Sequence, residues 1–309
     1  MTTIFPDGVL VVDKPAGPTS HDIVAVARRV THGKKVGHTG TLDPIACGVL
    51  PLVLGKATRL AQFLSSAEKE YVAELTLGRS TTTFDRTGET ASRQNARPVS
   101  ELSRADIDEA VAAFRGRSFQ QPPMFSAKKI DGDRAYDLAR KNTAVVLEPS
   151  DVTAYALEVI EWDGARLILR LVCSAGYYVR SLAQDLGERL NTGAHLAELK
   201  RTRSGDFSLE SAVSMADLDR HPEEAASRVI PLEQLLPTLP ALVMTAEGAS
   251  LASRGGFLSS GHLAGVQSIP AQGKVRLLHP DGHLVAIAEP SRRGAPDGAQ
   301  LLHPGIVLE

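Results

Sequence analysis

Two apolar segments joined by a tight turn place the strongest constraint on the fold. Residues 152–162 and 166–174 are rich in aliphatic side chains, and Asp163-Gly164 stands between them. An Asp-Gly pair in this setting is a strong hairpin signal, because glycine accepts positive φ angles without steric cost. Residues 71–78 alternate apolar and polar side chains, as a half-buried strand does. The chain is therefore expected to contain an antiparallel sheet.

Helical patterns separate these strands. Residues 21–30 repeat apolar side chains at helical spacing after Ser20, which we predict to be the N-cap. Residues 103–114 begin with a serine and have acidic side chains in the first turn, and residues 178–190 are amphipathic. We also predict a short helix over residues 192–199.

A change in composition predicts two domains. Residues 231–240 contain three prolines, and short apolar runs separated by glycine, proline and Asp-Gly turns follow them. Such runs are typical of a small β-rich, barrel-type unit. We therefore expect one domain over residues 1–236 and a second over residues 237–309.

The formal net charge of −2 hides a basic segment. Residues 112–142 hold seven basic and three acidic side chains, whereas residues 207–250 hold two basic and seven acidic ones. A local positive charge is what phosphate binding requires. An insertion at about residues 115–146, including Lys128 and Lys129, is thus predicted to bind phosphates; a solvated loop is the alternative.

Other classes of protein find little support. Cys47 and Cys173 lie far apart in no metal-binding or disulfide pattern, and no apolar stretch reaches the ~18 residues of a membrane span. The N-terminus has no basic region followed by an apolar run. These features lead us to expect a cytoplasmic protein without a metal site.

The densest unusual segment is residues 37–51. Gly37, Gly40 and Gly48 allow close approach of another backbone, and Pro44 favours an extended conformation for Asp43. Taken alone, an Asp before a Pro is a turn residue that caps its own backbone. The segment also lacks the Gly-Lys-Ser/Thr ending of a phosphate-binding P-loop.

The whole segment, however, resembles a family signature. The string GHTGTLDPIACGVLPLVLGKATR closely resembles that of the bacterial TruB family, whose members make pseudouridine at position 55 in the T-loop of tRNA. Further ordered matches are GVLVVDKPAGPTSHD (8–22), KEYVAELTLGRSTTTFDRTGE (69–89), QQPPMFSAKKIDGDRAYDLAR (120–140), CSAGYYVRSLAQDLGERL (173–190) and GAHLAELKRTRSG (193–205). The resemblance is specific up to about residue 237 and weak beyond it.

This resemblance implies an α+β fold and an activity. The family has a catalytic domain with a mixed, mostly antiparallel central sheet flanked by helices, and a small C-terminal β-rich PUA-like domain. It implies an isomerase that acts on tRNA without cofactor or metal, as a monomer that needs no protein partner. The alternative class is a non-catalytic RNA-binding or tRNA-folding protein on the same scaffold.

The resemblance also assigns catalytic roles. Asp43 matches the catalytic aspartate, and Arg180 matches the arginine that pairs with it. Tyr71 matches the tyrosine that stacks on the base and takes the proton from C5. Without the resemblance, Arg180 is an exposed helix residue and Tyr71 an ordinary core aromatic.

RNA contacts are implied at further positions. His38 matches the histidine that fills the space left by the flipped uridine, and Tyr178 and Leu199 match residues of the base pocket. Lys14 matches a lysine beneath the active-site loops, and Asp85 an aspartate near the RNA.

The chemistry explains why these residue types occur together. The carboxylate can attack C1′, take the C2′ proton, or add to C6 of the ring, and the sequence does not choose among these routes. All three need an ionised Asp in a dry pocket, where burial alone raises the pKa. A guanidinium that stays charged and binds both oxygens counters this effect.

Overall fold

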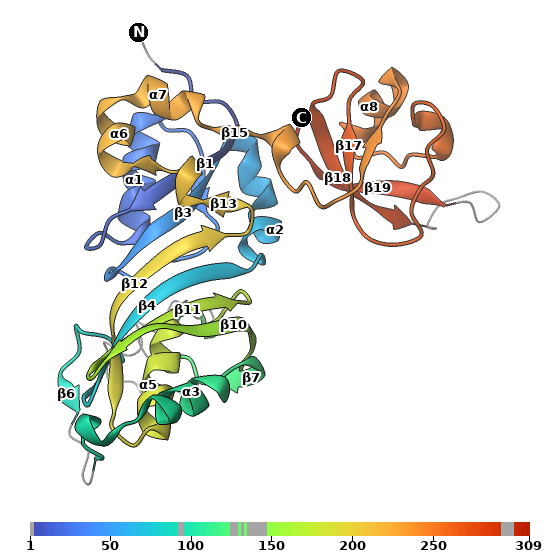
Figure 1. Ribbon diagram of the computed structural model, residues 1–309. Coiled ribbons are helices and arrows are strands. Elements are labelled where there is room, and N and C mark those ends of the chain that lie inside the picture. Colours follow the sequence, from blue (N-terminus) through green and yellow to red (C-terminus); the bar gives the residue numbers. More distant parts are fainter. Residues whose placement is uncertain (1–2, 92–95, 124–128, 131–132, 135–146, 292–299) are drawn as a thin grey trace.

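The computed structural model describes residues 3–91, 96–123, 129–130, 133–134, 147–291 and 300–309. Its main feature is an eleven-stranded sheet (Figure 1). The strands are β1 (Gly8–Lys14), β2 (Val36–His38), β3 (Ala46–Leu54), β4 (Lys69–Leu77), β7 (Gly116–Gln120), β10 (Ser150–Asp163), β11 (Arg166–Cys173), β12 (Ala194–Ser204), β13 (Phe207–Ser208), β14 (Val213–Ser214) and β15 (Ile230–Pro231).

The order of the strands is β14-β1-β3-β12-β4-β11-β10-β7, while β2, β13 and β15 pair with β3, β12 and β1. Only the β1–β14 and β3–β12 pairings are parallel in this sheet. The expected mixed, mostly antiparallel sheet is confirmed.

The expected hairpin is the β10–β11 pair. Asp163 pairs with Arg166, so the turn residues are Gly164 and Ala165, one position later than the sequence indicated. Gly164 has a φ of 54°, which explains why glycine stands there. Strand β11 then pairs with β4, so the hairpin extends the sheet beside Tyr71.

In the described ranges six α-helices accompany the large sheet, and all but the one at Ala61–Ser65 lie in two groups. They are α1 (Ser20–Val30), α2 (Ala61–Ser65), α3 (Arg104–Ala112), α5 (Val179–Arg189), α6 (Met215–Arg220) and α7 (Pro222–Ser227). Figure 1 shows α1, α6 and α7 beside β1 and β3, and α3 and α5 beside β10 and β11. Between the two groups, β12 and β4 run through the middle of the sheet.

Alternation along the central strands explains this layering. On β1, Leu10 and Val12 join the core that contains α1, α3 and α5, whereas Val9 and Val11 join a second core on the other face. Successive side chains of a strand point to opposite faces, so an unbroken apolar run is buried on both. The apolar run of β3 follows the same rule.

Two local predictions were wrong, and both differences shape the site. Thr19, not Ser20, caps α1, because the Ser20 hydroxyl instead bonds the backbone of Leu42 in both directions, at 3.0 and 2.8 Å. Residues 192–199 are not a helix, since most of them belong to β12 between β3 and β4. Their apolar spacing fits both structures, and pairing with two neighbours decides between them.

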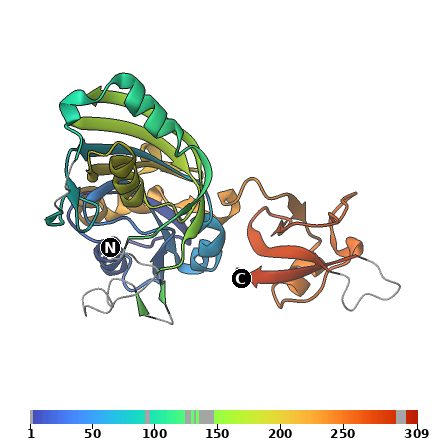
Figure 2. The same ribbon diagram turned by 90° about the horizontal axis from the view of Figure 1, so that it is seen from below.

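The C-terminal residues form a separate four-stranded sheet. Its order is β16 (Ala241–Val243), β17 (Val275–Leu278), β18 (Leu284–Ser291) and β19 (Leu301–Val307), with α8 (Ala246–Ala252) packed on it. Figure 2 shows this unit to one side of the large sheet. Leu284, Ile287 and Leu308 join the second core of the large sheet, so the two sheets are in contact.

The remaining strands are short pairs. They are β5 (Ser80–Thr81) with β6 (Thr90–Ala91), and β8 (Lys129–Ile130) with β9 (Asp133–Arg134). Over the ranges that the structure describes, no helix is both long and apolar enough to cross a membrane.

Candidate active site

A cavity of about 250 Å³ opens at the middle of the large sheet. Five of the predicted residues line it, from four different parts of the chain: Asp43, Tyr71, Tyr178, Arg180 and Leu199. The loop after β2, strands β4 and β12, and the start of α5 supply them. Residues far apart in the sequence therefore meet at one cavity.

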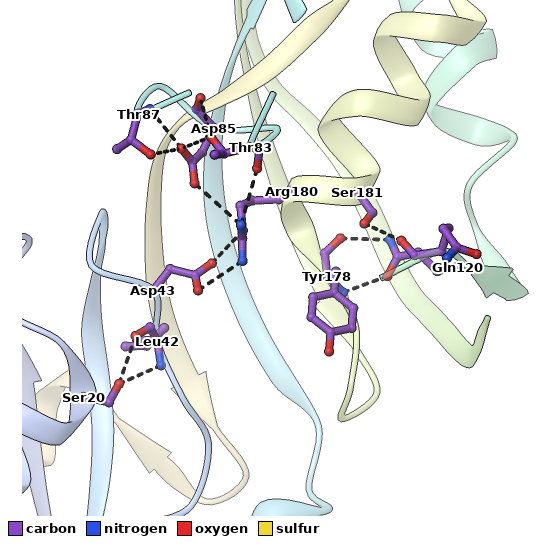
Figure 3. A network of polar contacts seen from close by, with 11 residues as sticks. Ser20, Leu42, Asp43, Thr83, Asp85, Thr87, Gln120, Tyr178, Arg180 and Ser181 are labelled. Carbon is purple, nitrogen blue, oxygen red and sulfur yellow. Dashed lines mark hydrogen bonds and ion pairs between the residues drawn. The ribbon is translucent and has the colours of Figure 1, made fainter. Parts of the chain in front are cut away.

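Asp43 is held by Arg180 (Figure 3). The Arg180 Nε lies 2.8 Å from one carboxylate oxygen of Asp43, and an Nη2 donates to the other at 3.3 Å. The Arg180 side chain is only 6% exposed, whereas that of Asp43 is 34% exposed. The arginine is thus the buried partner, and the carboxylate reaches the cavity.

A second carboxylate backs the same arginine. Asp85 lies 3.8 Å from Nη1 of Arg180 and accepts hydrogen bonds from Thr83 and from both the backbone and hydroxyl of Thr87. We call Asp43, Asp85 and Arg180 the carboxylate cluster. Burial raises the pKa of Asp43 above its ordinary value, Arg180 opposes this shift, and Asp85 adds to it.

The loop that carries Asp43 is fixed from below. Lys14 is fully buried, and its Nζ donates to the carbonyl of Ala46 at 2.6 Å and to that of Pro15 at 2.9 Å. Burial lowers the pKa of Lys14. The Ser20–Leu42 hydrogen bonds hold the loop from the side of α1. Lys14 does not line the cavity, so it supports the loop rather than the space above it.

Two further cations, Lys69 and Arg201, line the same cavity. Lys69 and Tyr71 lie on the same face of β4. Arg201 lies on the neighbouring strand β12, where it is the cross-strand partner of Tyr71. Arg201 is buried, and it donates to the carbonyls of Val49 at 2.7 Å and of Gly40 at 3.0 Å. We call Lys69, Tyr71 and Arg201 the cationic cluster.

Close packing around Arg201 requires a glycine. A Cβ on Gly48 would lie 2.2 Å from the carbonyl oxygen of Arg201, and the φ of Gly48 is 101°. The glycine-rich loop predicted from the sequence therefore lets β3 approach β12 at the cavity.

Two family profiles match residues 28–237 of this chain. The family profile described as "TruB family pseudouridylate synthase (N terminal domain)" matches residues 28–179, and the "tRNA pseudouridylate synthase B C-terminal domain" matches residues 180–237. A "tRNA pseudouridine synthase B" of Solibacter usitatus is 42% identical over 98% of this chain and 100% of its own length. The chain belongs to the TruB family of pseudouridylate synthases.

Further relatives agree with this assignment. The protein of the same name from Listeria monocytogenes is 37% identical over 98% of both chains. A solved Cbf5-Nop10-Gar1 complex contains a chain that matches 91% of this one at 31% identity, with a TM-score of 0.69 and 78% of that chain covered. An H/ACA RNP bound to a substrate RNA containing 2′-deoxyuridine matches at 27% identity over 98% of this chain and 85% of its own, with a TM-score of 0.71.

Of the other predicted RNA-binding residues, Tyr178 lines the cavity, His38 directly precedes the cavity-lining Thr39, and two lysines lie in a segment that the structure does not fully describe. His38 accepts a hydrogen bond from Gly40 at 3.3 Å and contacts the ring edge of His21, with 5.6 Å between centroids. Tyr178 is held by Gln120, which bonds its backbone carbonyl and amide at 2.8 and 2.7 Å. Neither Lys128 nor the side chain of Lys129 belongs to the described residues.

Sequence reasoning missed Lys69 and Arg201. Both lie inside motifs that carried the family resemblance, KEYVAELTLG and GAHLAELKRTRSG. The sequence signal that could have identified them is a basic residue at a strand position whose side chain faces the core, with an apolar or aromatic residue nearby. Such a residue usually has a specific partner, because burying an unpaired charge is costly.

A possible metal-ligand group lies elsewhere. His279, Asp281 and His283 surround the turn between β17 and β18, with ligand atoms within 4.8 Å of one another. None of these residues lines the cavity.

Proposed function

We propose that this protein isomerises the uridine at position 55 in the T-loop of tRNA to pseudouridine. The observation that carries the proposal is the carboxylate of Asp43, held by buried Arg180 at the edge of a cavity that Tyr71 also lines. Family membership supports the same reaction, since the curated relatives are named tRNA pseudouridine synthases.

The reaction breaks the N1–C1′ bond and forms a C5–C1′ bond, while the ring gains a proton at N1 and loses one from C5. Asp43 begins it by attack at C1′, by removal of the C2′ proton, or by addition to C6. Arg180 favours the ionised form of Asp43 that each route needs. No group leaves the substrate, so no cofactor is required.

Tyr71 serves the second half of the reaction. Its ring stacks on the uracil, an interaction worth ~1–3 kcal/mol in nucleic-acid complexes. Burial raises the pKa of Tyr71, and the positive charge of Arg201 opposes this shift. Arg201 therefore assists a phenol that is otherwise a poor base for the C5 proton.

The surrounding residues bind the RNA. His38 fills the space left by the flipped uridine, whose extrusion costs a few kcal/mol. Tyr178 and Leu199 enclose the base, Lys14 and Asp85 support the loop and Arg180, and a basic segment at about residues 115–146 with Lys128 and Lys129 grips phosphates.

The chain is organised in our proposal as a catalytic domain (1–236) and a PUA-like RNA-binding domain (237–309). The separate core of the C-terminal sheet supports this division. We expect a cytoplasmic monomer that acts on tRNA without a protein partner.

The decisive experiment measures tritium release from an unmodified tRNA transcript labelled at uracil C5. Wild-type protein is expected to release tritium. Asp43→Asn should reduce the rate by at least ~10²–10⁴, the range for loss of an acid–base group. Asp108→Asn, on the exposed face of α3, is the matched control and should leave the rate unchanged.

Each outcome separates the alternatives. No release by the wild type would contradict the enzyme and favour the RNA-binding or tRNA-folding class. Release that survives Asp43→Asn would remove Asp43 as the catalyst and leave the reaction class intact. A tRNA-folding activity in addition to catalysis would persist in the Asp43→Asn protein.

A further inference from the structure

The ammonium of Lys69 has one N–H donor that no described residue of the protein accepts. The side chain is buried to 5% exposure, yet it lines the cavity. Its Nζ donates to the carbonyls of Ser65 and Ala67. Throughout the described ranges no acceptor is found for the third N–H, and no carboxylate pairs with this ammonium. A buried cation with a free donor at a cavity is suited to a ligand oxygen.

Lys69 and Arg201 converge on the loop that carries Asp43. A Cβ placed on Gly40 would lie 3.5 Å from Nη1 of Arg201 and 3.8 Å from Cε of Lys69. Arg201 donates from Nε to the carbonyl of Val49 and from Nη2 to that of Gly40. Lys69 brings to the cavity a compact ammonium whose third N–H has no acceptor among the described residues.

We propose that Lys69 is a catalytic residue whose ammonium donates to a carbonyl oxygen of the uracil ring and stabilises the negative charge that develops there. This inference rests on the proposed function. It adds a group that acts on the base, whereas Asp43 and Arg180 act at the sugar or the ring carbon.

The charge arises on every route open to Asp43. When the N1–C1′ bond breaks, its electron pair stays with the base and spreads over N1 and the two carbonyl oxygens. When Asp43 adds to C6, the electron pair moves to O4 as an enolate. Lys69 transfers no proton in either case. A donor fixed before the reaction, in a site poor in water, stabilises such charge strongly.

Burial and the neighbouring Arg201 lower the pKa of Lys69 to about 8. Lys69 is therefore mostly charged at pH 7, and its contribution should be present below pH 8 and lost as the pH rises through that value. An alkaline limb near pH 8 is a signature that a purely structural lysine would not give.

The test is single-turnover tritium release with saturating enzyme, measured from pH 6 to 10. Lys69→Gln, whose amide can still donate to the Ser65 and Ala67 carbonyls, should lower the rate about 10²–10³-fold, the range for loss of one oxyanion donor. The alkaline limb should vanish, and tRNA affinity should change less than about threefold. Lys200→Gln, an exposed position on β12, should keep the limb.

Lys69→Arg tests the idea even if the Gln variant does not fold. Arginine stays charged, so activity should persist at pH 9 and above, where the wild type has declined. An unchanged limb in Lys69→Arg, a wild-type rate in Lys69→Gln, or a loss confined to tRNA affinity would each overturn the proposal. A wild type that releases no tritium would instead overturn the proposed function, and this inference with it.

Discussion

The carboxylate cluster and the cationic cluster face the same cavity but use charge in opposite ways. In the first, one guanidinium lies between two carboxylates, and Asp43, Asp85 and Arg180 satisfy one another. In the second, Lys69 and Arg201 contact backbone carbonyls, and within the described part of the chain neither forms an ion pair with an acid.

This difference separates two tasks. The charge of Arg180 is used inside the protein, where it favours the ionised form of Asp43. No acid among the described residues pairs with Lys69 or Arg201, so we expect the charges of the cationic cluster to be available to a ligand. A catalyst that makes an anion on a neutral base needs both arrangements, one to prepare the carboxylate and one to receive the charge.

Removal of Arg180 should have the largest effect on this contrast. Arg180→Met removes the guanidinium that lies between Asp43 and Asp85, and breaking a buried pair costs about 3–5 kcal/mol. The rate of tritium release should fall at least ~10²-fold, as for the loss of a catalytic acid–base group. Urea denaturation should give a lower free energy of unfolding.

The matched control for this change is Arg189→Met on the same helix. Arg189 is 46% exposed, and its nearest acid is Glu109 at 3.9 Å. An exposed pair of this kind contributes only ~0–1 kcal/mol. Equal losses in the two variants would show that Arg180 is no more than a surface charge of α5.

Asp85→Asn should have a smaller effect, which is a shift of the pH dependence of the rate in a defined direction. Asp85 raises the pKa of Asp43, so its neutralisation should lower that pKa. A raised pKa means that the folded protein holds the proton more tightly, and activity is lost as the pH falls through that value. The acid limb of the pH–rate profile should therefore move to lower pH in Asp85→Asn.

Arg180→Met should move the same acid limb the other way, to higher pH, because it removes the group that opposes burial. The control is Asp108→Asn, which neutralises a distant exposed carboxylate and should leave the limb in place. Limbs that shift in the same direction in the Asp85 and Arg180 variants would contradict a shared arginine between two acids.

The elements of the fold also differ in how well the sequence predicts them. Strands β4, β10 and β11 and helices α1, α3 and α5 were predictable, because their apolar periods are regular. Strand β12 was not, since its spacing of apolar residues suits a helix until β3 and β4 pair with it. Only the tertiary structure holds that information.

The residues of the site also differ in how far the sequence alone predicts them. Asp43 alone is a turn residue before a proline, and its pairing with Arg180 was expected only from the family resemblance. Arg201 was missed because its partners, the carbonyls of Val49 and Gly40, are 152 and 161 residues away in the chain. A buried cation that binds backbone atoms leaves no pattern of opposite charge in the sequence.

The smallest expected effect concerns Thr39, in the loop between the two clusters. Thr39 is buried and lines the cavity, and among the described residues its hydroxyl has no hydrogen-bond partner. Leaving such a group unpaired costs ~1–3 kcal/mol. Thr39→Val keeps the shape and removes that cost, so the free energy of unfolding should stay the same or rise.

The rate of tritium release then shows whether the Thr39 hydroxyl contacts the substrate. Like the third N–H of Lys69, the Thr39 hydroxyl has no partner among the described residues. If it contacts the substrate, Thr39→Val should be slower by roughly tenfold, which corresponds to the loss of one hydrogen bond of about 1.4 kcal/mol. Thr31→Val is the control, because the Thr31 hydroxyl donates to the Ala27 carbonyl at 2.8 Å. It should lose stability and keep its rate. Full activity in Thr39→Val would contradict a contact between the Thr39 hydroxyl and the substrate.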